Sequence, residues 1–154
     1  MQGSTAPGIS AEKAQQLLRD TGARVTRPRV RVLDFLLAKN APLTHHEILE
    51  QLPGDAFDAV TLYRVLEWLT ERAIVHRIAG ADQVWRFSAS AAGETGNTRH
   101  EHAHFQCTRC DGVTCFTDVP VPQRVKMPDG FINHEVDVLI RGTCPQCGIK
   151  GPAV

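Results

Sequence analysis

The stretch HEHAHFQCTRC, residues 100–110, concentrates three histidines, one glutamate and two cysteines in eleven positions. If this stretch is an extended strand, His100, His102 and His104 share one face, because strand side chains alternate with a period of two. Three imidazoles on one face make a poor hydrophobic core but suit half of a transition-metal site. A solvated, histidine-rich edge that binds no metal is the alternative interpretation.

Two pairs of cysteines have the spacing of metal-binding knuckles. Cys107 and Cys110 form one C-x2-C pair, and Cys144 and Cys147 form the other. Two such pairs commonly build a tetrahedral zinc site, whereas one pair alone would also fit a redox centre. The 33 residues between the pairs exceed the spacing of a compact zinc ribbon. We therefore predict one structural zinc, whose second knuckle returns from across a small domain.

Length and composition narrow the classes of protein. The 154 residues, 42% of them hydrophobic, suffice for one or two small domains. The 17 basic and 17 acidic residues cancel, so net charge does not indicate a polyanionic partner. No window is apolar enough to cross a membrane, and we expect no membrane partner. Five cysteines, four of them with metal spacing, favour a reducing cytoplasm over a disulfide framework. One local cluster of basic residues stands out: Arg19, Arg24, Arg27, Arg29 and Arg31.

The N-terminal half carries four helix signals. Apolar spacing predicts a helix over residues 10–20, and Thr26 can cap a second helix. Thr44 and Glu47 have the spacing of a capping box, which opens a third helix. Asp58 can cap a fourth. The apolar face of this fourth helix has helical periodicity and comprises Leu62, Val65, Leu66 and Leu69.

Two strand-like runs follow the helices. They are IVHRI (74–78) and QVWRF (83–87), joined by an Ala-Gly-Ala-Asp turn. Three or more helices followed by a hairpin indicate a winged helix, whose second helix-turn-helix helix enters the DNA major groove. Arg64 points away from the apolar face, flanked by Thr61 and Tyr63, and arginine is the commonest reader of guanine. A winged helix that binds protein instead of DNA is the alternative.

The expected fold class is α+β, with a winged helix-turn-helix domain followed by a small α/β domain that carries the cysteines. We place the first domain at residues 1–88, a small, polar hinge at 89–99, and a metal-binding dimerisation domain at 100–154. The last domain is too small to be stable on its own hydrophobic core, and a structural metal and a partner protomer usually stabilise domains of this size. Within it we expect strands at 105–107, 113–116 and 134–141 and a helical piece near 121–127.

Taken together, four motifs resemble those of the ferric uptake regulator family of bacterial metal-responsive repressors. They are R-x-T-R-x-R at 24–29, T-L-Y-R-V-L at 61–66, H-x-H-x-x-C-x-x-C at 102–110 and G-T-C-P-Q-C-G at 142–148. The resemblance covers nearly the whole chain. It implies a dimer with a structural zinc on four cysteines, and a second, regulatory metal near the hinge that closes the dimer onto DNA.

The resemblance also implies which residues contact the operator. Tyr63 and Arg64, with Thr61 beside them, would meet DNA bases, and Arg27 would meet phosphate. The partner would be double-stranded DNA, bound by a homodimer.

The sensed metal is a separate question. The family's iron-sensing branch usually carries a histidine and a glutamate where this chain has Pro42 and Arg86, and both departures weaken an iron interpretation. The zinc-sensing branch resembles this chain more closely, with a wing ligand at the position of His76. The cysteine that this branch often has at the end of the wing is missing.

Cys115 is the candidate replacement for that cysteine, because a thiolate beside imidazoles suits zinc. The alternative for Cys115 is a small, buried, structural residue. The predicted regulatory zinc ligands are His76, His102, His104 and Cys115, with His100 as the alternate.

The leading hypothesis is a zinc-responsive transcriptional repressor of metal uptake genes, and not an enzyme. Iron, manganese, nickel or peroxide sensing are alternatives within the same family. A zinc hydrolase could use three histidines and a water, but Glu101 is the only carboxylate near them that could serve as a base. A structural zinc adaptor with a protein-binding winged helix is the third class.

Overall fold

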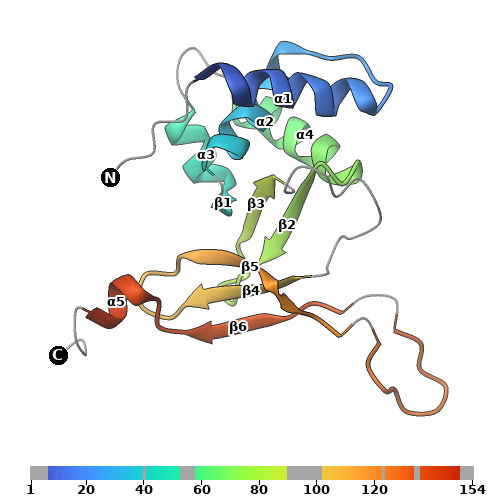
Figure 1. The fold of residues 1–154 in the computed structure, drawn as a ribbon, viewed down its shortest axis with the longest axis vertical. Helices are drawn as coiled ribbons and strands as arrows, with labels where there is room; N and C mark the ends of the chain where they lie inside the picture. Colours follow the sequence, from blue (N-terminus) through green and yellow to red (C-terminus); the bar gives the residue numbers. More distant parts are fainter. Residues whose placement is uncertain are drawn as a thin grey trace.

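The computed structural model describes residues 7–39, 41–52, 58–89, 102–122, 124–133 and 136–149. A helical layer stands on a small sheet, and a second sheet lies beneath it (Figure 1). The expected α+β class is confirmed. Residues 90–101, which hold most of the expected hinge and the candidate ligand His100, lie outside the described residues. Among the described residues, no helix combines the length and apolar character needed to cross a membrane.

The first half is a helical bundle with a hairpin. Its elements are α1 (Pro7–Asp20), α2 (Arg27–Lys39), β1 (Leu43–Thr44), α3 (His45–Gln51), α4 (Ala59–Glu71), β2 (Val75–Ala79) and β3 (Trp85–Ala89). The strand order is β1-β3-β2, with both pairs antiparallel. The helix α1 begins three residues earlier than expected, at Pro7, where proline fits because a first-turn N–H needs no helical partner.

Local capping signals set the helix starts. The Thr44 side chain accepts a hydrogen bond from the Glu47 N–H, and the Thr44 N–H donates in return to the Glu47 carboxylate at 2.7 Å. The Asp58 carboxylate accepts from the Thr61 N–H at 2.6 Å and caps α4. The expected face of α4 is buried in one cluster with α1, α2, α3 and the hairpin. This cluster is the main core of the molecule.

The second half is a three-stranded sheet. Its elements are β4 (His102–Cys107), β5 (Val113–Pro120), β6 (Leu139–Gly142) and the short α5 (Pro145–Ile149). The central strand β4 pairs antiparallel with β5 and parallel with β6. Three expectations need correction. Residues 136–138 of the strand expected at 134–141 are not in a strand, and β6 spans 139–142. The hairpin strand expected at 83–87 lies at 85–89, and the described residues of 121–127 are not helical.

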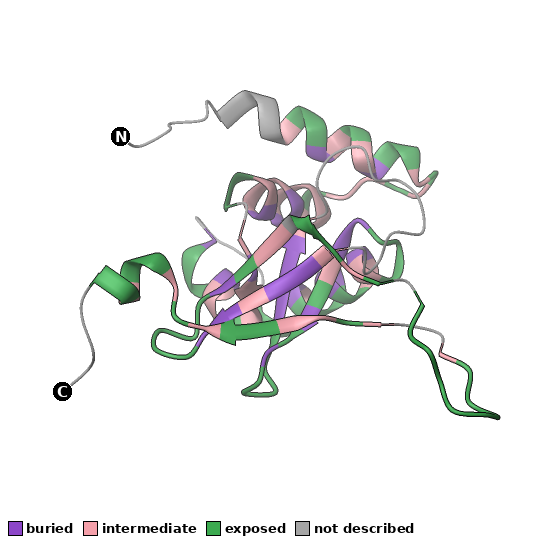
Figure 2. Cartoon of the chain, turned by 60° about the horizontal axis from the view of Figure 1, so that its bottom comes forward, coloured by how far each residue is buried: buried purple, intermediate pink, exposed green. Residues whose placement is uncertain are grey.

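Burial differs between the halves. Figure 2 shows buried residues in the helical half and along the middle of the lower sheet, while α5 and the loop after β5 are exposed. Large apolar side chains in the second half remain in solvent, among them Phe131 at 66% and Ile132 at 79% exposure. The second half therefore has a thin core of its own.

The hairpin stacks on the second sheet and joins the two halves. His76 pairs with Ser88, and Ile78 with Arg86, so these four side chains share the hairpin face opposite Phe87. Ile78, Arg86 and Ser88 are each at most 7% exposed. This face meets β4 and β5, and it positions the site described next.

Candidate metal centres

Four cysteine sulfurs meet at one end of the second sheet. Cys107 ends β4, Cys110 lies in the turn after it, Cys144 precedes α5, and Cys147 lies within it. Their sulfur atoms all lie within 4.8 Å of one another. The Sγ atoms of Cys110 and Cys144 are 3.9 Å apart, close to the edge of about 3.8 Å that a tetrahedral zinc with Zn–S bonds of about 2.3 Å requires. The four residues fit one tetrahedral metal ion.

The parallel strand pair explains how the distant second knuckle reaches the first. Cys107 is in register with Gly142, and the Thr108 N–H donates to the Gly142 carbonyl at 2.8 Å. The Arg109 guanidinium then donates to the Cys147 carbonyl at 2.8 Å. The 33 residues between the knuckles include β5 on one side of β4 and then β6 on its other side.

The environment of the cysteines favours thiolate at one position. Backbone N–H groups of Cys144 and Arg109 each donate to the Cys107 sulfur at 3.4 Å. The pKa of Cys107 is lowered to about 6, chiefly by the N–H of Cys144. The pKa of Cys147 is raised to about 12, first by hydrogen bonding with the Cys144 thiol and then by hydrogen bonding with the Cys110 thiol. Four thiolates at this spacing need a cation between them.

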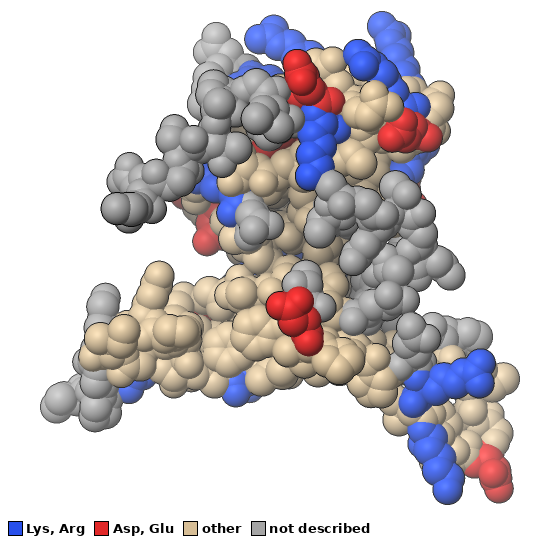
Figure 3. Space-filling view, viewed as in Figure 1, with Lys and Arg blue, Asp and Glu red and all other residues tan. Residues whose placement is uncertain are grey.

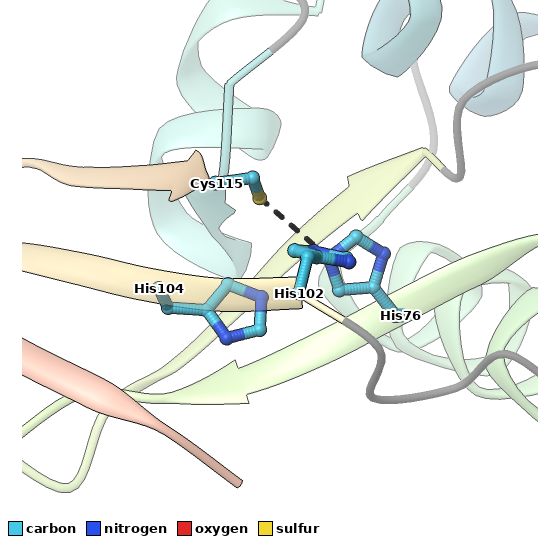
Figure 4. Close-up of side chains that lie close together, drawn as sticks. All are labelled: His76, His102, His104 and Cys115. Carbon is cyan, nitrogen blue, oxygen red and sulfur yellow. Dashed lines mark hydrogen bonds between the residues drawn. The ribbon is translucent and has the colours of Figure 1, made fainter. Parts of the chain in front are cut away.

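Three histidines and the fifth cysteine form a second cluster between the hairpin and the second sheet (Figure 4). His76 comes from β2, His102 and His104 from β4, and Cys115 from β5. One donor atom from each lies within 4.8 Å of the others. The Cys115 sulfur is 3.7 Å from Nε2 of His76. The ring centroids of His102 and His104 are 4.7 Å apart, consistent with one shared strand face.

The register of the sheet places Cys115 opposite His104, so the two side chains lie on one face as direct cross-strand neighbours. Burial raises the pKa of the Cys115 thiol, so a nearby cation is needed to favour its thiolate. Three nitrogens and one sulfur at these separations fit one tetrahedral transition-metal ion. The sequence-predicted ligands His76, His102, His104 and Cys115 thus come together, whereas His100 and Glu101 lie outside the described residues.

Arg86 takes no part in this cluster. Its guanidinium donates to both carboxylate oxygens of Asp82, at 3.0 and 2.8 Å, and its side chain is 8% exposed.

The candidate DNA-contacting residues lie on the helical half. Tyr63 on α4 is 55% exposed, and Arg64 beside it and Arg27 at the start of α2 are exposed. Thr61 is half-buried, and its N–H donates a hydrogen bond to the capping carboxylate of Asp58. Lys and Arg side chains gather over the helical end of the face in Figure 3, with acidic side chains among them, while the sheet below carries few charges.

Sequence reasoning missed some roles in this region. The guanidinium carbons of Arg29 and Arg72 lie 3.6 and 4.0 Å from the ring centre of Trp68. Both arginines are therefore stacked on the indole and are not simply presented to solvent. Val60, on the outer face of α4, is 60% exposed. His45 holds the start of α4 through its Nε2, 3.0 Å from the Ala59 carbonyl. Only the exposure of Val60 could have been foreseen, from helical periodicity.

Residues 20–135 match the model of the ferric uptake regulator family. The chain belongs to this family. A ferric uptake regulation protein of Legionella pneumophila is 31% identical over 150 residues, covering 88% of this chain and 98% of that relative. Members of the ferric uptake regulator family are transcriptional regulators and not enzymes, so the zinc hydrolase alternative is discarded.

Solved structures share the fold. A zinc uptake regulator complexed with zinc and DNA has a TM-score of 0.68 at 18% identity, covering 96% of this chain and 98% of that one. The Vibrio cholerae ferric uptake regulator has a TM-score of 0.59 at 23% identity, covering 84% of this chain and 98% of that one. The expected resemblance is confirmed, and the chain is a metal-responsive transcriptional regulator of the ferric uptake regulator family.

Proposed function

We propose that this regulator is a zinc-responsive, dimeric repressor that binds operator DNA when zinc occupies the cluster of His76, His102, His104 and Cys115. The observation that carries the proposal is the composition of this cluster, three imidazoles and one thiol within 4.8 Å. Soft thiolate and imidazole donors suit zinc, whereas carboxylate oxygens suit manganese. The four-cysteine cluster would hold a second zinc that is purely structural, because it leaves no coordination position open.

The origin of the four donors supports a role in regulation. His76 belongs to the hairpin of the helical half, and the other three belong to the second sheet. A metal held by both halves favours one angle between them, and this angle sets where α4 is presented. If DNA selects the same arrangement, zinc and DNA strengthen each other's binding, typically by about 1–3 kcal/mol.

Exposed apolar side chains support the dimer. Phe131 and Ile132, with Met127 and Val125, lie on the second half in contact with solvent. A partner protomer that covers them would complete its thin core. A two-fold dimer then requires a pseudo-palindromic operator, with Tyr63, Arg64 and Thr61 toward bases and Arg27 toward phosphate. Such a protein works beside the chromosome, in keeping with the cytoplasm expected from cysteine usage.

Iron is the second candidate, because the curated relatives are ferric uptake regulation proteins. The donor set argues against it, since the described cluster contains no carboxylate and does contain a thiol.

The decisive experiment is a metal titration read out by DNA binding. The protein, stripped of exchangeable metal but keeping its structural zinc, is mixed with DNA that the zinc-loaded protein has selected from a random pool. Zinc should raise DNA affinity at lower free concentration than Fe²⁺ or Mn²⁺. Tight DNA binding driven by Fe²⁺ but not by zinc would replace zinc with iron in this proposal.

Two variants assign the ligands. Cys115→Ser should keep the structural zinc and raise the zinc concentration needed for DNA binding by about tenfold or more, equivalent to about 1.4 kcal/mol. His76→Ala should abolish the response, since it removes the described ligand that joins the two halves. Thr114→Ala, an exposed neighbour on β5, is the matched control. A Cys115→Ser protein that responds at the wild-type zinc concentration would leave His100 or Glu101 as the fourth ligand.

A further inference from the structure

The face of β4 that carries His102 and His104 continues to a third residue, Gln106. Side chains two apart on a strand share a face, so Gln106 lies about 7 Å beyond His104 on the side toward the hairpin. Gln106 is 3% exposed. Its Oε1 accepts a hydrogen bond from the Ala81 N–H at 2.7 Å, across 25 residues of sequence. This bond joins the second sheet to the tip of the hairpin.

The hairpin tip is stiff enough for such a bond to position it. The Gln83 N–H donates to the Gly80 carbonyl at 2.9 Å, closing a β-turn in which Ala81 is the second residue. The paired Arg86 and Asp82 brace the same turn. A Cβ at Gly80 would collide with both of these side chains, so glycine lets them pack there. The outward N–H of Ala81 is therefore presented by a rigid unit.

The two connections lie at opposite ends of one interface. The histidine and cysteine cluster joins the hairpin to β4 at one end, the bond from Ala81 to Gln106 joins them at the other, and the buried Ile78 lies on the hairpin face between them. A single attachment point leaves a body free to rotate about it, whereas two fix its orientation.

We propose that Gln106 is a positioning residue for the regulatory site: a clasp, independent of the regulatory metal, that holds the hairpin where His76 meets the other ligands. This inference rests on the proposed function and adds to it. When only a fraction of the protein molecules has the arrangement that binds the ligand, the apparent affinity is the intrinsic affinity multiplied by that fraction. The clasp raises the fraction, so the metal has less rearrangement to drive.

The Ala81 amide itself gives a test that needs no metal and no DNA. Hydrogen exchange is followed in the full chain with its structural zinc present and the regulatory site emptied by a chelator. We expect the Ala81 amide to be protected in this form and unprotected in Gln106→Met, which keeps the length of the side chain but lacks the acceptor. An Ala81 amide that gains protection only when metal is added would overturn the clasp.

The matching test on the metal site uses Co²⁺, whose absorption reports thiolate ligation. Gln106→Met should weaken Co²⁺ binding at the regulatory site about fivefold, the change expected for one ordinary hydrogen bond. Ala81→Pro removes the donor of the same bond, at a turn position that proline favours, and should weaken Co²⁺ binding equally. Because both act on one bond, the double variant should also lose only about fivefold. If Gln106→Met fails to fold, Ala81→Pro alone provides the test.

Controls separate positioning from general damage. Thr108→Val removes a nearby side-chain hydrogen bond, to the Gly142 carbonyl at 3.2 Å, that does not reach the hairpin, and it should leave Co²⁺ affinity unchanged. At saturating metal, Gln106→Met should bind DNA as the wild type does, whereas its metal-free DNA binding should fall. Wild-type Co²⁺ affinity in both variants, or additive losses in the double variant, would refute the inference. If the wild type shows no thiolate–cobalt absorption, the proposed function fails, while hydrogen exchange still tests the clasp.

Discussion

Asp82 and Arg86 make a close ion pair at the hairpin tip, and this pair makes the stability of the fold depend on pH. Hydrogen bonding by Arg86 lowers the pKa of Asp82 to about 2. Because the folded pKa lies below the unfolded value of about 4, the stabilisation is complete above pH 4 and is lost as the pH falls through 2. Asp82→Asn should therefore cost about 1 kcal/mol at pH 7, a figure kept low because the Asp82 side chain is 34% exposed and solvent screens its charge.

Chemical unfolding of both proteins between pH 7 and pH 2 measures this difference. Loss of metal in acid affects the two alike, so the difference between them isolates the ion pair. It should shrink between pH 4 and pH 2. Asp129→Asn, in the exposed loop after β5, is the control. A difference between wild type and Asp82→Asn that persists unchanged at pH 2 would assign the effect to something other than the carboxylate charge.

Spacing within one strand or one knuckle could be predicted at the residue scale, but contacts between distant residues could not. His102 and His104 share a face because of strand periodicity alone, and each C-x2-C pair is local. The bond from Ala81 to Gln106 depends on how the hairpin docks on β4, and the stacking of Arg29 on Trp68 depends on how α2 crosses α4. Neither leaves a signature in the sequence.

Helices were more predictable than strands at the element scale, for a physical reason. Caps and the apolar stripe of α4 are encoded within four residues of one another, so their positions could be read directly. Strand limits depend on partners. The two-residue β1 exists because it pairs with β3, and β6 is shorter than its alternating pattern because only Leu139–Gly142 pairs with β4.

The helices α2 and α4 should divide DNA recognition between them. Arg64, exposed on α4, is expected to read a base, and Arg27, exposed at the start of α2, to contact phosphate. Arg64→Ala should cost about 1–3 kcal/mol of DNA binding and relax preference at one base position per half-site. Arg27→Ala should weaken binding to all sequences and lower the salt dependence by about one unit.

Binding to a panel of single-mismatch operators at several salt concentrations separates these roles. Lys126→Ala, in the exposed loop of the second half, removes a positive charge far from α4 along the chain and controls for net charge. If Arg64→Ala and Arg27→Ala changed the mismatch profile in the same way, the division between base reading and phosphate contact would be wrong.

The two halves of the whole molecule are stabilised differently. The main apolar cluster lies in the helical half and its hairpin, from Ala14 to Phe87. Among the described residues of the second sheet, the buried apolar side chains besides the candidate ligand Cys107 are Ala103 and Val113. A metal that links β4 to the segment after β6 therefore has to contribute stability there that a core would otherwise supply, because metal binding free energy becomes folding free energy.

Removing one structural ligand should expose this asymmetry. Cys144→Ser should lose about one zinc per protomer, together with the second sheet and the dimer, because three thiolates no longer enclose the ion. The helical half should keep its helicity and its own unfolding transition, since its core contains no metal ligand from the four-cysteine cluster. Zinc content by mass spectrometry, circular dichroism and sedimentation measure the three effects, with the exposed neighbour Thr143→Ala as control. A Cys144→Ser protein that stays dimeric, folded and fully metallated would show that the four cysteines are not one structural site.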